Sequence, residues 1–441
     1  TGTGKTIVSA LDFKRLKHWH RSIKQPLSGY EIGRLQQLSQ RVDELWAEHT
    51  QALARDRART EDSVAVWPHH QGLGAEPRRL SRASKEAIRQ QGLLNEDGDL
   101  ATPFRRLKLV MDYWCALWFW PISRSAELPS REQWWLEVGA ILEGNVVELE
   151  QQRGLDLQPT APEAPQLLLP EAQPSLAGFE AQQLPLSQPS GGTHLPSLHD
   201  KLGQLRISKL RQHFPRVVLV EGIAEQRRFM HWELCFADVL LGARLGPDGQ
   251  PQRGGFDLIL GNPPWLKVEW NEAGILGERN PVFAVRNISA SNLARLRADA
   301  FERFAGLQAD WTDELQEAEG LQNFLNAVQN YPVLKGVQTN LYKCFMPLAW
   351  GLSSAQGVAG LLHPEGPYDD PKGGALREAL YARLRRHFQF QNEFQLFVGT
   401  NDHGRLRFGL HIYGSESPAV GFEHISNLFA PATVDACYQS R

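Results

Sequence analysis

The chain is poor in cysteine and has no long hydrophobic run. Its four cysteines, Cys115, Cys235, Cys344 and Cys437, lie far apart, and no two have the CxxC spacing of a zinc ribbon or a thioredoxin-type motif. We therefore expect no metal site, and scattered cysteines fit a reducing cytoplasm. No apolar run approaches the roughly 18 residues of a membrane span, and no secretory signal is recognisable. These absences predict a cytoplasmic protein without a membrane partner.

A strong net charge is also missing. The 47 basic and 50 acidic residues give a formal net charge of -3 at pH 7, which excludes a simple polyanion-binding protein of basic composition. DNA binding stays open, because it needs a local basic groove and not a basic average. The 441 residues are 42% hydrophobic and 22% charged, which indicates a globular chain of two or three domains.

The spacing of apolar residues and the distribution of prolines divide the chain into regions. Residues 27–60 and Leu107 to Trp120 have apolar residues at helical intervals, and Pro121 ends the second helix. The aromatic residues near Trp118 are interpreted as core and not as a base-stacking surface. Eight prolines fall between Pro159 and Pro196, which is a linker composition. We assign residues 1–150 to a mainly helical region, 151–200 to a Pro-rich linker or insertion, 201–430 to a catalytic core and 431–441 to the start of a following segment.

After the Pro-rich segment the pattern becomes α/β. Buried strands are predicted for Arg216 to Val220, Phe256 to Leu260 and Gly357 to Leu362, and a helix for Gly373 to Arg386. Two further apolar runs, Phe388 to Phe397 and Leu406 to Tyr413, are close enough to pair as a hairpin. Alternating strands and helices predict a mostly parallel sheet with a terminal antiparallel hairpin.

The most informative segment is a strand that leads directly into Asn262-Pro263-Pro264-Trp265. Ligands of open α/β sheets bind at the carboxyl ends of strands, where this tetrapeptide would lie. The two prolines fix φ and remove two backbone donors. The Asn262 side-chain oxygen and the Pro263 carbonyl can accept the two hydrogens of an exocyclic amine, which favours a pyramidal, nucleophilic nitrogen. Trp265 can stack on a base that has left the duplex.

The sequence FDLILGNPPW resembles motif IV of the amino-methyltransferases of restriction–modification systems, especially adenine-specific enzymes of the gamma arrangement. It is similar to the methylase parts of fused restriction–methylation enzymes and to the large methyltransferases of phage-defence islands. The resemblance covers roughly Leu205 to Phe429. It implies a Rossmann-like methyltransferase sheet, S-adenosylmethionine as cofactor, double-stranded DNA as partner, and other restriction or phage-defence subunits as further partners. It gives Asn262, Pro263 and Trp265 the handling of a flipped adenine.

The resemblance also suggests cofactor residues. The segment before motif IV in this family commonly has an acidic residue that bonds the adenine amino group of the methyl donor, so Asp238 and Asp257 are the candidates here. Tyr342 can line the pocket, although packing is the simpler role. The family's glycine-rich cofactor loop is not recognisable, and we expect it N-terminal to Thr1. Cytosine C5 methylation would need a cysteine nucleophile, usually after proline, and no cysteine here follows proline. Cytosine N4 methylation uses similar chemistry, but Asn262 favours adenine.

Two other functions stay open. The run Thr1 to Thr6, TGTGKT, has part of a phosphate-loop pattern, but the preceding strand and first glycine would lie outside the chain. A non-catalytic DNA-binding scaffold with a degenerate methyltransferase fold would explain the missing glycine loop. Arg377, Arg383, Arg385 and Arg386, predicted on one helix, fit phosphate contacts or a solvated helix face. His403 in Asn401 to Gly404 is interpreted as a turn residue and not as a catalytic base.

Overall fold

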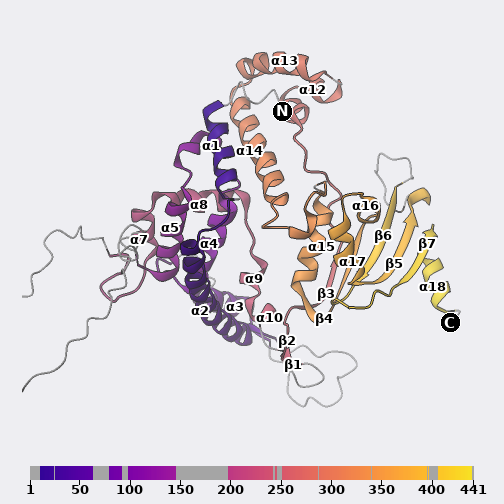
Figure 1. The fold of residues 1–441 in the computed structure, drawn as a ribbon, viewed down its shortest axis with the longest axis horizontal. Coiled ribbons are helices and arrows are strands. Elements are labelled where there is room, and N and C mark those ends of the chain that lie inside the picture. The colour runs from indigo at the N-terminus through magenta and orange to yellow at the C-terminus, as the bar shows by residue number, and fades with distance from the viewer. Residues whose placement is uncertain are drawn as a thin grey trace, which may run out of the picture.

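The computed structural model describes residues 10–23, 25–62, 79–91, 98–145, 197–241, 244–245, 251–286, 288–338, 340–394, 396 and 406–439. The run Thr1 to Thr6, most of the Pro-rich segment and Asn401 to Gly404 lie outside these residues. The described part has a helical lobe, drawn at the left of Figure 1, and a five-stranded sheet with its own helices at the right. Within it, no helix combines the length and apolarity that a membrane span needs.

The described residues between 10 and 145 are mainly helical. Helix α2 (Gly29–Thr60) begins at Ser28, whose side chain and that of Glu31 form a capping box, and it confirms the helix predicted for residues 27–60. The remaining elements are α1 (Ala10–Ser22), α3 (Arg82–Gln91), α4 (Pro103–Ala116), the 3₁₀ helix η2 (Ile122–Glu127) and α5 (Arg131–Glu143). Helix α4 runs from Pro103 to Ala116, so it begins and ends earlier in the chain than the helix predicted for Leu107 to Trp120.

The aromatic residues around Trp118 lie in the core of the helical lobe, as predicted. Tyr113, Trp118 and Trp120 are all buried. Trp118 packs edge-on against Trp19 of α1, with ring centroids 5.9 Å apart. The same core includes residues from beyond the Pro-rich segment, among them Leu210 and Val220. Residues on both sides of that segment therefore share one hydrophobic core.

The strand predicted for Arg216 to Val220 is wrong. These residues lie in α8 (Pro215–Arg227), with Pro215 in its first turn, and α8 packs against α4. Val217, Val220 and Ile223 are buried and Val218 is exposed, which is helical and not alternating spacing. A short run of β-branched residues fits both structures, and only the longer window distinguishes them.

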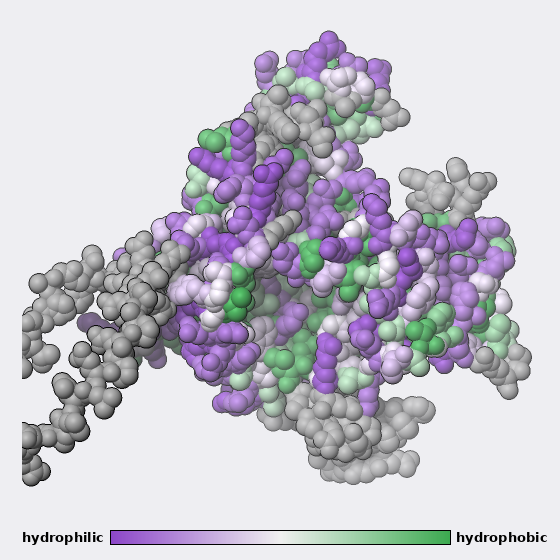
Figure 2. All heavy atoms as spheres, viewed as in Figure 1, coloured by the Kyte–Doolittle hydropathy of each residue, from purple (hydrophilic) through white to green (hydrophobic). Residues whose placement is uncertain are grey.

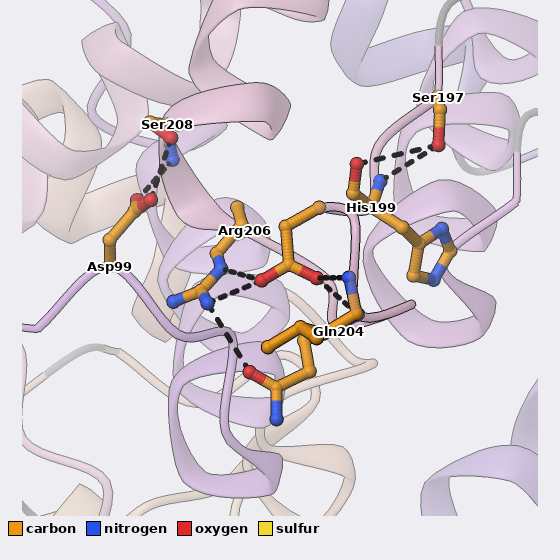
Figure 3. A network of polar contacts seen from close by, with 8 residues as sticks. Asp99, Ser197, His199, Gln204, Arg206 and Ser208 are labelled. Carbon is orange, nitrogen blue, oxygen red and sulfur yellow. Dashed lines mark hydrogen bonds and ion pairs between the residues drawn. The ribbon is translucent and has the colours of Figure 1, made fainter.

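A polar network joins the chain before and after the Pro-rich segment (Figure 3). The carboxylate of Asp99 accepts hydrogen bonds from the backbone and the hydroxyl of Ser208, at the start of α7 (Ile207–His213). Asp200 accepts the backbone N–H of Gln204 over 2.9 Å and Nε of Arg206 over 2.8 Å. The turn before α7 is therefore fixed by local hydrogen bonds, which positions α7 and α8 on the helical lobe.

The sheet contains β3 (Phe256–Gly261), β4 (Ser353–Pro364), β6 (Arg407–Tyr413), β5 (Leu384–Gln391) and β7 (Glu423–Leu428), in that spatial order. The pairs β3–β4 and β5–β7 are parallel, whereas β6 is antiparallel to both β4 and β5. The sheet is therefore mixed, and the prediction of a mostly parallel sheet is corrected. The predicted antiparallel pairing of β5 with β6 is confirmed, but β6 lies inside the sheet, and β7 was not predicted.

Helices pack on both faces of the sheet, and four further helices form a separate hydrophobic cluster. One face of the sheet packs against α15 (Leu341–Leu352) and α17 (Gly374–Tyr381), and the other packs near β7 against α18 (Ala432–Gln439). A separate cluster joins α11 (Glu272–Arg279), α12 (Val282–Val285), α13 (Ala290–Arg303) and α14 (Leu307–Leu325). The shorter elements are α9 (Trp232–Cys235), α10 (Ala237–Leu240), β1 (Arg244–Leu245), β2 (Pro251–Gln252), η3 (Pro332–Leu334), α16 (Gly366–Asp369) and η4 (Asn392–Phe394).

The helix predicted for Gly373 to Arg386 is only partly correct. Helix α17 ends at Tyr381, and β5 begins at Leu384. The expected arginine face of one helix is therefore wrong. Arg383 pairs with Glu416 over 2.6 Å, and Arg386 pairs with Glu423 over 2.9 Å across the β5–β7 pair. Ion pairs with residues distant in the sequence, and not a shared helix face, hold Arg383 and Arg386.

Candidate functional site at the carboxyl end of β3

The predicted strand and the tetrapeptide that follows it lie where the sequence placed them. Strand β3 ends at Gly261, which is opposite Leu361 of the parallel neighbour β4. Asn262 to Trp265 therefore follow β3 at the carboxyl edge of this parallel pair. Asn262 and Pro264 are exposed, Pro263 is buried, and Trp265 is half-buried. This is the edge at which open α/β sheets bind ligands.

Trp265 fixes the loop to the sheet. Its indole Nε1 donates a hydrogen bond to the carbonyl oxygen of Leu362 over 3.2 Å, and its ring lies 6.1 Å from that of Phe408 on β6. The next residue is also tied down, because the carbonyl of Leu266 accepts the backbone N–H of Leu341 at the start of α15 over 3.0 Å. A loop held at both points presents the preceding Asn262 in a defined position.

Asn262 is the polar side chain that this loop leaves available. It makes no hydrogen bond to any residue that the structure describes, and it faces solvent. Its amide offers one oxygen acceptor and two N–H donors. Pro263 and Pro264 have no N–H with which to compete for that acceptor. The arrangement can accept hydrogen bonds from a ligand that carries an N–H group.

The structure does not bring Asp238 and Asp257 to this loop. Asp238 lies on α10, which is joined to the start of β3 by the hydrogen bond from the Gly255 N–H to the Val239 carbonyl. Its Oδ2 lies 2.6 Å from Nε of Arg57. Asp257 is exposed near the start of β3 and accepts a hydrogen bond from Ser354. Asp257 is thus about a strand length from Asn262, since each strand residue spans about 3.3 Å. Asp238 precedes Val239, whose carbonyl bonds to Gly255 at the opposite end of β3 from Asn262.

No strand in the described residues pairs with the other side of β3. Leu258 and Leu260, on one face of β3, are 60% and 73% exposed, and Val358 of β4 lies beside them at 37%. Figure 2 shows hydrophobic residues gathered in the middle of this face of the molecule, between the helical lobe and the sheet. This apolar surface next to the loop is one that a strand or helix would normally cover.

Two clefts of the described residues lie elsewhere. One of about 470 Å³ lies among α4, α7 and α8 and is lined by charged residues such as Arg105, Asp112 and Arg211. Another of about 720 Å³ lies between α1 and the segment that leads into α5. Neither is lined by Asn262 or Trp265. Asn262 and Pro264 are exposed, so this loop lies at the surface.

Tyr342 has a packing role, the simpler of the two considered from the sequence. Its ring is buried in the cluster between α15 and the sheet and stacks on His363, with centroids 5.4 Å apart. Burial raises the pKa of its phenol well above the ordinary value, which keeps the hydroxyl protonated. His403 lies outside the described residues.

Sequence reasoning missed a buried histidine cluster on the face of the sheet that α15 and α17 cover. It contains His363 of β4, His387 of β5 and His411 of β6, with Glu365 directly after β4. The rings of His363 and His411 are stacked with centroids 3.7 Å apart. Burial lowers the pKa of His363 to about 4, so its imidazole is neutral. The signal in the sequence is weak: single histidines within three apolar strands.

Comparisons with protein-family models, with curated proteins and with solved structures found no significant match. The function is therefore inferred from the residues and their geometry.

Proposed function

We propose that this chain is a catalytic part of a DNA methyltransferase that transfers a methyl group from S-adenosylmethionine to the N6 amino group of adenine, within a restriction–modification or phage-defence system. One observation carries the proposal: the exposed, unpartnered amide of Asn262, in a Pro-Pro-Trp loop at the carboxyl end of the edge strand β3 of an α/β sheet. The resemblance of FDLILGNPPW to motif IV supports methyl transfer to an amino group as the reaction at this loop.

The proposed reaction needs no covalent nucleophile. The Asn262 side-chain oxygen and the Pro263 carbonyl accept the two hydrogens of the adenine amine, so that its lone pair points at the methyl group of the sulfonium. The nitrogen–methyl bond forms as the sulfur–methyl bond breaks, and the nitrogen then releases one proton. Holding the two reactants in line provides much of the rate enhancement. Trp265, held by Leu362 and Phe408, offers a rigid aromatic surface beside the base.

Neither candidate cofactor residue lies beside Asn262. Asp238 faces Arg57, and Asp257 lies at the other end of β3. The edge of β3 that no described strand pairs with offers another place for the cofactor-binding residues. A strand added parallel to that edge would end beside Asn262, and the loop after it would then hold the methyl donor next to the base.

A non-catalytic scaffold is the second candidate function, and the same edge favours it. In the described residues nothing pairs with β3 on that side, and Leu258 and Leu260 stay exposed. Such a chain would bind DNA without binding the methyl donor. The phosphate-loop hypothesis rests on Thr1 to Thr6, which the structure does not describe.

The deciding experiment begins with calorimetric titration of S-adenosylmethionine into the purified 441-residue chain. Radioactive methyl transfer to unmethylated DNA is then measured for the wild type, Asn262→Ala and Asn292→Ala. Asn292 is also exposed, but it lies on α13 and serves as the matched control. We expect Asn262→Ala to lose at least about 100-fold in rate, and Asn292→Ala to keep it. Wild-type turnover in Asn262→Ala would refute the site, and a folded chain that binds DNA without the methyl donor would favour the scaffold.

A further inference from the structure

Three side chains from separate parts of the chain converge under α15 and α17. Glu365 follows β4, His387 lies on β5 and His411 lies on β6. Oε1 of Glu365 is 3.0 Å from Nε2 of His387 and 3.7 Å from Nε2 of His411. All three candidate ligand atoms lie within 4.8 Å of one another. Ligands of a tetrahedral zinc ion are about 3.3 Å apart, given metal–nitrogen distances of about 2.0–2.1 Å. The spacing therefore fits one shared ion after small side-chain adjustments.

His411 is the member of this cluster whose buried ring nitrogens lack hydrogen-bond partners among the described residues. Its side chain is fully buried, and neither ring nitrogen makes a hydrogen bond of ordinary geometry with a described residue. A buried polar group without a partner costs about 1–3 kcal/mol. A metal ion bound to Nε2 would satisfy that atom directly.

The charges in the cluster also suit a cation. Glu365 is a buried carboxylate, and burying a negative charge is costly unless a positive charge or several donors compensate it. A neutral imidazole keeps the lone pair that a metal ion binds. A metal ion beside Glu365 would supply that positive charge.

Gly409 leaves room where such an ion would lie. It is on β6, opposite His363. A Cβ built on Gly409 would lie 2.5 Å from Oε1 of Glu365 and 2.7 Å from Nε2 of His411. The missing side chain thus opens the space between these two atoms. On the far side of the carboxylate, Oε2 of Glu365 accepts a hydrogen bond from Gln389 over 3.4 Å, which orients the group.

We propose that Glu365, His387 and His411 bind one divalent transition-metal ion, with Zn²⁺ as the best match. Two imidazoles and a carboxylate are nitrogen and oxygen ligands of the kind that Zn²⁺ and Fe²⁺ prefer. The ion joins β5 and β6 to the segment after β4, and a water molecule completes the coordination. The site is independent of the proposed methyl transfer. It departs from the expectation of no metal site, which rested on cysteine spacing alone.

The test uses the tag-free chain, stripped with a chelator and titrated with Zn²⁺ by calorimetry and with Co²⁺ by visible absorbance. Four proteins are compared: the wild type, Glu365→Gln, His411→Leu and His424→Gln. His424 is the matched control, because its ring is 4.7 Å from that of His387 but it is exposed and outside the triad. Thermal melts of each metal-free and Zn²⁺-bound protein report folding.

We expect the wild type and His424→Gln to bind one equivalent of Zn²⁺ and to melt at a higher temperature with it. Glu365→Gln and His411→Leu should lose at least about 100-fold in affinity. Metal-free His411→Leu should melt no lower than the metal-free wild type, since it removes two unsatisfied nitrogens. The proposal would be overturned if the folded wild type did not bind Zn²⁺. It would also be overturned if Glu365→Gln and His411→Leu bound Zn²⁺ as tightly as the wild type.

Discussion

The indole Nε1 of Trp265 donates a hydrogen bond to the carbonyl oxygen of Leu362, 3.2 Å away at the end of the neighbouring strand. This bond joins the loop after β3 to β4, and the ring of Phe408 supports the indole from β6. The residue assigned to base stacking is therefore also a structural link across three strands. Substitution can separate this structural role from the proposed stacking role.

Trp265→Phe removes the hydrogen bond and keeps an aromatic ring. We expect a loss of about 0.5–1.5 kcal/mol in the free energy of unfolding, with methyl transfer reduced but measurable. Trp265→Ala also removes the packing against Phe408 and should cost about 3 kcal/mol. Urea denaturation and methyl-transfer rates of both variants provide the check. Equal rates for the two would show that the ring does not contribute to base binding.

Two glycines should respond in opposite ways to substitution by alanine: Gly255, which precedes β3, and Gly222, which lies in α8. Gly255 has φ +143°, and an added Cβ would lie 2.5 Å from backbone atoms of both Ser353 and Ser354. We expect Gly255→Ala to destabilise the fold by about 2–4 kcal/mol. Gly222 is exposed within α8 with open space at its Cβ, so Gly222→Ala should stabilise by about 0.5–1 kcal/mol. Destabilisation by Gly222→Ala would contradict the helix that replaces the predicted strand.

The contact of Asp238 with Arg57 favours a structural role for this carboxylate. Asp238→Asn should lower the free energy of unfolding by about 1 kcal/mol, because Arg57 is only partly shielded from solvent. Arg57→Met should have a similar effect, and neither should change affinity for S-adenosylmethionine. Calorimetric titration of both variants makes the comparison. Weaker donor binding by Asp238→Asn alone would restore its assignment to the cofactor site.

His49 makes stability depend on pH. Burial lowers its pKa below the ordinary value of 6.5, although Nε2 is bonded to the Leu234 carbonyl over 2.8 Å. The folded state then binds fewer protons than the unfolded state, so the contribution of His49 is complete above about pH 6.5 and is lost as the pH falls below it. His49→Gln should therefore melt with a smaller difference between about pH 7.5 and 5.5 than the wild type. An unchanged difference in His49→Gln would exclude the effect.

The features that the sequence predicted correctly depend on neighbouring residues. Helix α2 has a capping box and a long apolar periodicity, and β3 is an apolar run that ends in prolines. The position of Asn262 at the end of β3 follows from adjacency alone. The errors come from ambiguous or distant information. A valine-rich run in α8 fits a strand as well as a helix, and Leu384 begins a strand where helical spacing seemed to continue.

The partners of several key side chains could not have been predicted. Arg57 meets Asp238 through packing of α2 on α10, and Glu365 meets His387 and His411 through the strand order of the sheet. No local pattern encodes that order. The candidate base site was predictable because four consecutive residues form it, whereas the buried histidine cluster required the fold.

The position of β6 has a consequence for synthesis of the chain. It pairs on one side with β4 and on the other with β5, both of which precede it. A nascent chain that stops before residue 407 would hold β3 and β4 as a two-stranded ribbon and β5 without either neighbour, and such ribbons are only marginally stable in water. We therefore expect this half of the molecule to close in one late event, when residues 407–413 leave the ribosome and enter the gap.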